Sequence, residues 1–273
     1  MKIVLGWGRK VFYRFFPSGH VSAYIRTLYL KRSLRGLKFQ RALDAGCGPG
    51  AFTLFLAQRF PEAQLKGYDI SGAEIQKATE AAKEKGITNV IFEVQDLRRM
   101  EEKDEYDFIF SLECLEHIHG NQKVIGNFVQ ALSPGGVLFI MMPCEKIHKF
   151  LFPRNWFEEY TQWTAKEHIG DQYTLDELVP ILEGLGVRTL QAQYTFGFWG
   201  KLAWELSMLT VNKRKLHRLL LPMLLLIGLL DVVLPLGKGS PYGLLVLGQK
   251  VEDTLAGHAI QRWPCPKGWT VSG

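Results

Sequence analysis

Residues 43–50 read Leu-Asp-Ala-Gly-Cys-Gly-Pro-Gly. The stretch contains the end of a short apolar run, Arg41–Ala45, and precedes a run of helix formers, Ala51–Phe60, that stops at Pro61. Glycines between a strand and a helix permit unusual φ angles and let the backbone approach a ligand closely. The first turn of the helix offers N–H groups to an anionic or polar ligand. The stretch therefore predicts either a ligand-binding loop or a tight strand–helix turn that binds nothing.

Strand-like and helix-like runs alternate from residue 41 to residue 143. The predicted strands are Arg41–Ala45, Gln64–Ile70, Asn89–Val94, Tyr106–Leu112 and Val137–Met142, and the predicted helices are Ala51–Phe60, Ala73–Glu84 and Gln122–Leu132. Farther along, the pattern predicts a helix at Leu175–Leu185 and strands at Val187–Phe196 and Tyr242–Lys250. Such alternation implies βαβ units, and therefore an α/β fold with a mostly parallel, seven-stranded sheet and helices on both of its faces.

Three carboxylates stand where predicted strands end. Asp44 lies at the tip of the first strand, Asp69 closes the second strand 23 residues after Gly46, and Asp96 follows the third strand. The carboxyl ends of parallel strands meet at one edge of the sheet, so we expect these side chains beside the glycine loop. A carboxylate at the position of Asp69 can accept hydrogen bonds from both hydroxyls of a ribose, and Asp96 suits a contact to an adenine amino group.

The loop fits two kinds of nucleotide ligand. Gly46, Gly48 and Ala51 match G-x-G-x-x-A, the fingerprint of dinucleotide-binding loops, and Asp69 would serve either kind. Asp44, however, would repel a pyrophosphate, whereas it suits a ligand that carries an ammonium and a sulfonium group. The other features that favour the second ligand are Pro49 and Asp96.

At these positions the chain resembles the class I S-adenosylmethionine-dependent methyltransferases, and more narrowly the small-molecule group (types 11 and 12) that includes the quinone-biosynthesis methyltransferases. The resemblance rests on Leu43–Gly50, Asp69, Asp96, Tyr106–His117 and Leu132–Gly136, covers about residues 41–143, and continues weakly over residues 168–178. It implies a Rossmann-like methyltransferase fold, S-adenosylmethionine as the cofactor and direct displacement at the sulfonium methyl group. These motifs are specific for fold and cofactor and say little about the acceptor.

We expect the cofactor site at this edge of the sheet, with the methyl acceptor beside it. The candidate cofactor-binding residues are Asp44, Ala45, Gly46, Cys47, Gly48, Gly50, Asp69, Ile70, Asp96, Leu97, Glu113 and Cys114. His117 is the candidate general base, because an imidazole can take up a proton near neutral pH. Alternatively, His117 caps a short helix or holds a neighbouring loop.

A metal site is a second hypothesis for the same segment. Glu113, Glu116 and His117 have the spacing i, i+3, i+4, which places side chains on one face of a helical turn. Two carboxylates and an imidazole can bind Mg²⁺ or a transition metal, and the set resembles a cluster with which some quinone O-methyltransferases hold a divalent cation. The group often carries a similar Leu-Glu-His without a metal, and we therefore expect none here.

We divide the chain into a basic, aromatic N-terminal helical cap (residues 1–40), a methyltransferase domain (residues 41–250) and an irregular tail (residues 251–273). Within the domain, residues 144–173 have no clear period and are rich in aromatic side chains, so we expect an irregular acceptor wall or lid there. The candidate residues of this wall are His148, Trp156, Tyr160, Trp163 and His168. Residues 197–241 form an apolar insertion that we interpret as helical.

Two segments bear on the acceptor. Residues 1–41 carry ten Lys or Arg and no acid, a charge of +10 against +6 for the whole chain, so the remainder carries −4. Leu219–Leu230 lacks any polar side chain, whereas a spanning helix needs about 20 apolar residues. The cationic residues just before it are Lys213, Arg214, Lys215 and Arg218. We interpret the insertion as a packed or dimer-forming helix, with peripheral membrane contact as the alternative and a spanning helix disfavoured, because the chain must return to the last strand.

These segments favour a small or lipid-like acceptor, such as a quinone, a lipid or a lipid-linked glycan, and they permit contact with a membrane surface. Oligomer formation stays open, and nucleic acid is disfavoured because no Asn/Asp-Pro-Pro-Tyr-like motif follows the fourth strand. The cysteines, Cys47, Cys114, Cys144 and Cys265, match no zinc or disulfide pattern, and no signal-peptide core is evident. We expect a cytoplasmic protein, or one that lies peripherally on the inner face of a membrane.

Two other functions stay open. A nicotinamide-dependent oxidoreductase would use the same loop and Asp69, and it predicts binding of NAD(H). A catalytically silent, membrane-associated scaffold predicts cofactor-independent recruitment through residues 1–40 and 213–236. The full set of glycines and carboxylates argues against the scaffold, which has no physical need for them.

Overall fold

The computed structural model of the chain describes residues 20–144, 146–234, 236 and 240–251. The chain divides into two compact units. The sheet unit comprises Leu34–Lys146, His168–Gln193 and the chain from Leu244 onward, and the helical unit comprises the chain up to Ser33, Ile147–Glu167 and Tyr194–Gly243. Predictions for residues 1–19 and 252–273, which include part of the basic segment, nearly all of the tail and Cys265, lie outside the described residues.

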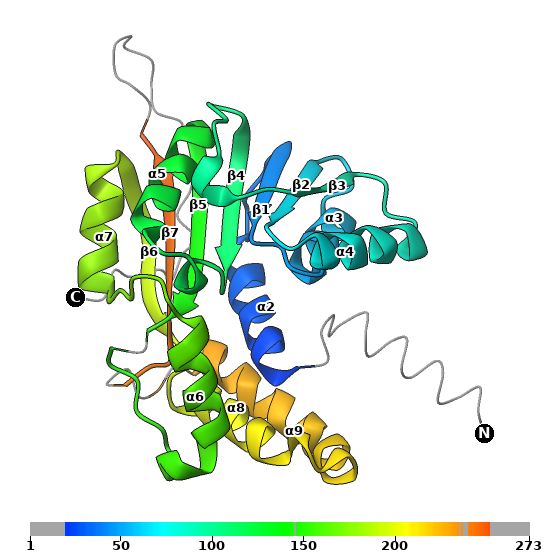
Figure 1. Cartoon of the computed structure of the whole chain (residues 1–273), viewed down its shortest axis with the longest axis vertical. Helices are drawn as coiled ribbons and strands as arrows, with labels where there is room; N and C mark the ends of the chain where they lie inside the picture. The colour runs from blue at the N-terminus through cyan, green and yellow to red at the C-terminus, as the bar shows by residue number, and fades with distance from the viewer. Residues whose placement is uncertain (1–19, 145, 235, 237–239, 252–273) are drawn as a thin grey trace. The chain divides into compact units, whose positions relative to one another are not determined.

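A seven-stranded sheet forms the centre of the sheet unit (Figure 1). Its strands are β1 (Arg41–Ala45), β2 (Gln64–Asp69), β3 (Val90–Val94), β4 (Tyr106–Leu112), β5 (Leu132–Pro143), β6 (Val187–Thr195) and β7 (Gly243–Lys250), in the order β3-β2-β1-β4-β5-β7-β6. The pairs β1–β2, β1–β4, β2–β3 and β4–β5 are parallel. The strand order reverses between β1 and β4, and a ligand binds an open α/β sheet at the carboxyl ends of the strands beside such a reversal.

Helices lie around this sheet (Figure 1). They are α3 (Ala51–Arg59), α4 (Gly72–Lys85), α5 (Asn121–Ala131) and α7 (Leu175–Gly184), joined by the short 3-10 turns η1 (Leu97–Arg99) and η2 (Leu115–His117). The Ser71 hydroxyl accepts a hydrogen bond from Glu74 N at the start of α4, which ends at Gly86 with a φ of 65°. Thr174 and Glu177 form a capping box at the start of α7. These caps satisfy backbone groups that the ends of a helix leave without partners inside the helix.

The middle strands are apolar on both faces. Phe108, Ile109 and Phe110 of β4 and Phe139 and Ile140 of β5 are fully buried. A parallel strand that is covered on both faces has a nearly continuous apolar sequence, which explains why β4 and β5 are visible as unbroken apolar runs. Burial of each such side chain stabilises the fold by about 1.5–3 kcal/mol.

The seven predicted strands and the predicted helices of the sheet unit are confirmed, with ends that shift by a few residues; the largest shift is at β5, which begins at Leu132 rather than Val137. The expectation that residues 144–173 are irregular is wrong for part of that segment. It contains η3 (Arg154–Phe157) and α6 (Glu158–Glu167). Thr164 is the one buried residue of α6, so no apolar stripe of helical period marks this helix in the sequence.

The helical unit contains α2 (Val21–Ser33), α6, α8 (Phe198–Val211) and α9 (Arg214–Val233), which confirms that the apolar insertion is helical. α9 packs against α8 and α2. The buried carboxylate of Asp231 accepts hydrogen bonds from Tyr29 Oη and Gly200 N, both at 2.8 Å. Gly200 permits this approach, because a Cβ there would lie 2.7 Å from Asp231 Oδ2.

α9 is long and apolar enough to cross a membrane, by length and composition alone; it is the one such helix in the part of the chain that the structure describes. One face of α9 is buried: Leu224, Leu225, Gly228, Asp231 and Val232. A buried aspartate and a packed face are features of a helix that belongs to a folded unit.

Candidate active site

The glycine loop joins β1 to α3 through three residues in the left-handed region, Gly46, Gly48 and Gly50, with φ values of 86°, 49° and 77°. The backbone N–H groups of Gly46 and Cys47 both donate to Tyr68 O of β2, at 2.9 and 2.8 Å. A Cβ at Gly46 would collide with the Cys114 side chain that follows β4. The loop thus needs glycine at position 46 for both its φ and its close approach to the neighbouring strand end.

Asp69 links the loop to the end of β2. Its Oδ2 accepts a hydrogen bond from Gly48 N at 2.8 Å, and its Oδ1 accepts one from Ser71 N at 2.9 Å. Each carboxylate oxygen has a second lone pair, so the group can still accept hydrogen bonds from a ligand. The structure therefore places Asp69 where the sequence predicts it, beside the glycine loop.

Asp44 lies beneath the loop and is 2% exposed. Its Oδ2 accepts a hydrogen bond from Thr53 Oγ1 of α3 at 2.6 Å. Burial, with the nearby negative charge of Asp69 as a smaller cause, outweighs this bond and raises the pKa of Asp44 to about 7. Asp44 is thus poised between its neutral and ionised forms near neutral pH.

Asp96 follows β3 and caps η1. Its carboxylate accepts two hydrogen bonds from the Arg98 guanidinium, at 3.0 and 2.9 Å, and one from Arg98 N at 3.0 Å. The guanidinium holds the pKa of Asp96 below its ordinary value, which keeps the group anionic. The ion pair between Asp96 and Arg98 was not predicted. It depends on a local turn, which leaves no periodic pattern in the sequence.

A cavity of about 440 Å³ opens at the carboxyl ends of β1, β2, β3 and β4. It is lined by Gly46, Gly48, Asp69, Ile70, Gln95, Asp96, Leu97, Arg98, Glu113, Cys114, His117, Ile118, His119 and Ile169. Nine of these are candidate residues from the sequence: Gly46, Gly48, Asp69, Ile70, Asp96, Leu97, Glu113, Cys114 and His117. Four candidates do not line the cavity: Asp44, Ala45, Cys47 and Gly50.

Five lining residues were not predicted from the sequence: Gln95, Arg98, Ile118, His119 and Ile169. Gln95, Arg98 and Ile118 adjoin candidate residues, and His119 follows Ile118, so their place in the segments after β3 and β4 was the available signal. Ile169 comes from a distant segment of the chain, and its signal was weaker: it follows His168, a candidate of the acceptor wall, in the stretch over which the resemblance is weak.

Glu113 and Cys114 form the wall next to the glycine loop. Glu113 has a φ of 52°, a strained backbone conformation for a residue with a side chain, and its N–H donates to Met141 O of β5 at 2.9 Å. Such strain is concentrated at ligand sites. Burial raises the pKa of the Cys114 thiol, so this sulfur is a poor nucleophile and a wall residue rather than a reactive one.

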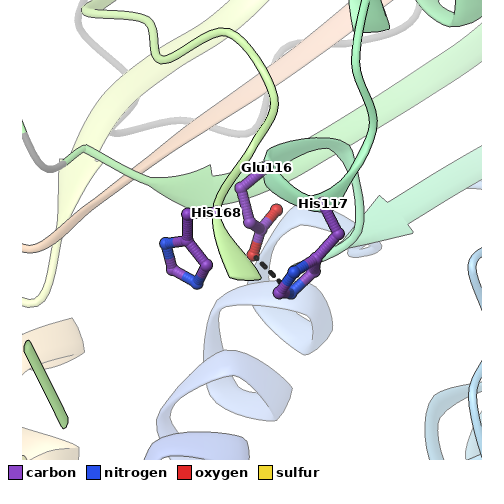
Figure 2. Close-up of side chains that lie close together, drawn as sticks. All are labelled: Glu116, His117 and His168. Carbon is purple, nitrogen blue, oxygen red and sulfur yellow. Dashed lines mark ion pairs between the residues drawn. The ribbon is translucent and has the colours of Figure 1, made fainter. Parts of the chain in front are cut away.

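His117 lies beside Glu116 and His168 at the edge of the cavity (Figure 2). Its Nε2 is 4.0 Å from Glu116 Oε1, and 36% of the His117 side chain is exposed against 1% for Glu116. The His117 and His168 rings meet edge to face, with centroids 5.0 Å apart. Among the described residues, the cluster with metal-ligating atoms is Glu116, His117 and His168, so it differs from the spacing-based set, which contained Glu113.

Residues 38–186, more than half of the chain, match a family model described as "Methyltransferase domain". The chain is similar to trans-aconitate 2-methyltransferase of Variovorax paradoxus, with 36% identity over 104 residues, which are 38% of each chain. It is also similar to (S)-coclaurine N-methyltransferase of Papaver somniferum, with 29% identity over 125 residues, 44% of this chain and 36% of that protein. The matched stretch thus spans less than half of the length of these curated relatives.

Solved structures share the fold. The phosphoethanolamine N-methyltransferase 2 of Haemonchus contortus, in complex with phosphomonomethylethanolamine and S-adenosylhomocysteine, has a TM-score of 0.62 at 19% identity over 83% of this chain and 52% of that one. An S-adenosylmethionine-dependent methyltransferase from Mesorhizobium loti has a TM-score of 0.57 at 18% identity over 84% and 97%. The matched residues include the glycine loop and the carboxylates at the strand ends. The family match shows that the chain belongs to the S-adenosylmethionine-dependent methyltransferases.

Proposed function

We propose that the protein transfers a methyl group from S-adenosylmethionine to a small or lipid-like acceptor that enters the cavity. The observation that carries the proposal is the arrangement of Asp69, held by the Gly48 and Ser71 N–H groups, at a cavity that the glycine loop borders. A nicotinamide-dependent oxidoreductase is less well supported, because residues 38–186 match a methyltransferase family model.

The residues present fit S-adenosylmethionine. The loop would approach the cofactor through Gly46 and Gly48, where no side chain intervenes, and Asp69 would accept the ribose hydroxyls through its remaining lone pairs. Ile70 and Leu97 add apolar wall for the adenine ring. Asp96 would contact the adenine amino group. Further proposed contacts come from the loop itself, through Asp44, Ala45, Cys47 and Gly50. Glu113 and Cys114 would contact the cofactor from the side opposite the loop.

When bound, S-adenosylmethionine supplies a methyl group that its sulfonium already activates. The chain must hold the acceptor in line with that methyl group and exclude water; such positioning contributes up to about 7–11 kcal/mol in the best intramolecular cases. We assign His117 the role of general base, because its imidazole lines the cavity and adjoins the buried Glu116 carboxylate, which can orient it.

The exposed face of α9 supports a lipid-like acceptor and peripheral contact with an anionic membrane. Apolar side chains recur along this face at spacings of three, four and seven residues: Leu216, Leu219, Met223, Leu226 and Val233, which are 41%, 76%, 45%, 61% and 60% exposed. Exposed cationic side chains stand at the start of the helix: Lys213, Arg214, Lys215 and Arg218. An apolar stripe next to basic residues is typical of helices that lie in the plane of a membrane interface.

We expect Asp44 to release a proton when the cofactor binds. Because the folded-state pKa of about 7 is above the ordinary value, the stability that the neutral carboxyl confers is present below about pH 4 and is lost as the pH rises through 7. A cationic ligand group beside Asp44 favours the carboxylate and lowers this pKa, so cofactor binding at pH 7 should release up to about half a proton. Calorimetric titrations in two buffers of different ionisation enthalpy measure this release, which should vanish at pH 9 and in Asp44→Asn. Equal proton release by Asp44→Asn and the wild type would refute the role of Asp44.

The acceptor class can be tested by isotope transfer. The protein is incubated with S-adenosylmethionine labelled in its methyl group and with the organic-soluble and aqueous fractions of a cell extract. We expect label in the organic-soluble fraction, because the exposed apolar face of α9 suits delivery from a lipid phase. Label that enters only aqueous compounds contradicts the lipid-like acceptor but keeps methyl transfer.

Membrane contact has a separate test. Wild-type protein should sediment with vesicles that contain phosphatidylserine, and the double variant Leu219→Lys/Leu226→Lys should bind at least about tenfold more weakly, because two exposed leucines no longer enter the interface. Ile91→Lys, which changes a 57% exposed side chain of β3, is the matched control and should bind like the wild type. Equal binding by all three proteins contradicts docking through α9.

A further inference from the structure

Three side chains with metal-ligating atoms converge at the edge of the cavity (Figure 2). Glu116 and His117 belong to η2, directly after β4, and His168 belongs to the segment before α7. One ligating atom of each residue lies within 4.8 Å of those of the other two, and Glu116 Oε1 is 4.0 Å from His117 Nε2. Segments that are far apart in the chain therefore bring two imidazoles and one carboxylate together.

This donor set has a clear metal preference. Imidazole nitrogen suits Zn²⁺, Fe²⁺ and Co²⁺, whereas Mg²⁺ and Ca²⁺ prefer oxygen ligands. Two histidines and a glutamate are also a known set for a zinc ion that keeps one position open for water or substrate. Tetrahedral ligation with bonds of about 2.0–2.1 Å requires ligating atoms about 3.4 Å apart, so atoms that lie within 4.8 Å of one another must close by up to about 1.4 Å. Small χ rotations suffice for such a movement.

The backbones that carry the cluster are fixed by contacts of their own. Gly170 N donates to Glu116 O at 2.8 Å, and the Asn121 side-chain amide donates to Leu115 O at 2.9 Å and to Asp171 O at 3.0 Å. A Cβ at Gly170 would lie only 2.5 Å from Leu115 O, so glycine is required for this approach. Ligands on a rigid support need little ordering when an ion binds, which favours affinity.

The buried charge of Glu116 and the adjacent cavity also favour a cation at this place. The Glu116 carboxylate is 1% exposed, and a cation beside it offsets the loss of hydration that burial imposes. His117 lines the cavity, as do Ile118 and Ile169, which adjoin the cluster in the sequence. A cation at this place would have a buried anionic ligand on one side and the cavity on the other.

We propose that Glu116, His117 and His168 bind one divalent transition-metal ion of the Zn²⁺ kind, whose open coordination position is available to an oxygen atom in the cavity. This site reverses the expectation of no metal, and it contains His168 in place of Glu113. Binding of the ion does not depend on the proposed function, but the use of the ion does. A bound hydroxyl of the methyl acceptor would release its proton to solvent water more readily, as metal-bound water does. The oxygen would then form its bond to the methyl group while the S–CH₃ bond of the sulfonium breaks. His117 would then hold the ion instead of acting directly as the base.

Cobalt binding tests the proposal. Full-length protein, freed of metal by a chelator, is titrated with Co²⁺, and its visible absorption is recorded. We expect a band that saturates at one Co²⁺ per chain and disappears when Zn²⁺ displaces it. His168→Gln and the isosteric Glu116→Gln should each weaken Co²⁺ binding at least about 100-fold, because each removes a ligand. Far-UV circular dichroism and the thermal unfolding midpoint, neither of which depends on the proposed function, establish that the variants are folded.

Two matched controls separate this site from its neighbours. His119→Gln removes a cavity-lining histidine outside the cluster, and Glu113→Gln removes the carboxylate of the spacing-based set; both should bind Co²⁺ like the wild type. Absence of a stoichiometric band in the wild type overturns the proposal, and so does a band that survives in His168→Gln and Glu116→Gln. Loss of the band in Glu113→Gln overturns the ligand set. None of these outcomes alters the test of cofactor binding, so the two proposals can fail separately.

Discussion

The hydrogen bond from Gly48 N–H to the Asp69 carboxylate is the contact on which the site depends. It joins the glycine loop after β1 to the end of β2, at the place where the strand order reverses. Asp69 also accepts a hydrogen bond from Ser71 N, so one carboxylate orients both the loop and the turn that precedes α4. The left-handed conformations of Gly46, Gly48 and Gly50 are compatible with this arrangement because these residues have no Cβ. Contacts within the chain therefore orient the carboxylate.

Local rules were enough to predict the sheet and nine of the fourteen residues that line the cavity. Asp69 was predicted because it ends a strand next to a glycine loop, and parallel strands place their carboxyl ends at one edge. The burial of Asp44 and its bond to Thr53 were not predicted, because they depend on how the first turn of α3 packs on β1. The convergence of His168 with Glu116 and His117 rests on Asn121 and Gly170, which join segments distant in the chain and leave no periodic signal.

The proposed division of labour follows from the chemistry of each part. The proposed cofactor side presents backbone N–H groups and carboxylates, which suit a ribose, an adenine and cationic groups. The acceptor side carries imidazoles and apolar side chains, His117, Ile118, His119 and Ile169, which suit an acceptor that gives up a proton. In the proposed function, the exposed apolar face of α9 serves delivery of the acceptor rather than chemistry, so we expect that activity toward a dissolved acceptor does not depend on it.

The most direct test of the central claim is calorimetric titration of the folded protein with S-adenosylmethionine, S-adenosylhomocysteine and NADH. The account predicts micromolar binding of the first two and none of NADH, and it predicts that Asp69→Ala loses at least about 100-fold in affinity, as expected when a charged hydrogen-bond acceptor for the ribose is removed. Failure of a folded wild-type sample to bind either S-adenosyl compound would contradict the account, and binding that survives in Asp69→Ala without change would remove the proposed ribose contact.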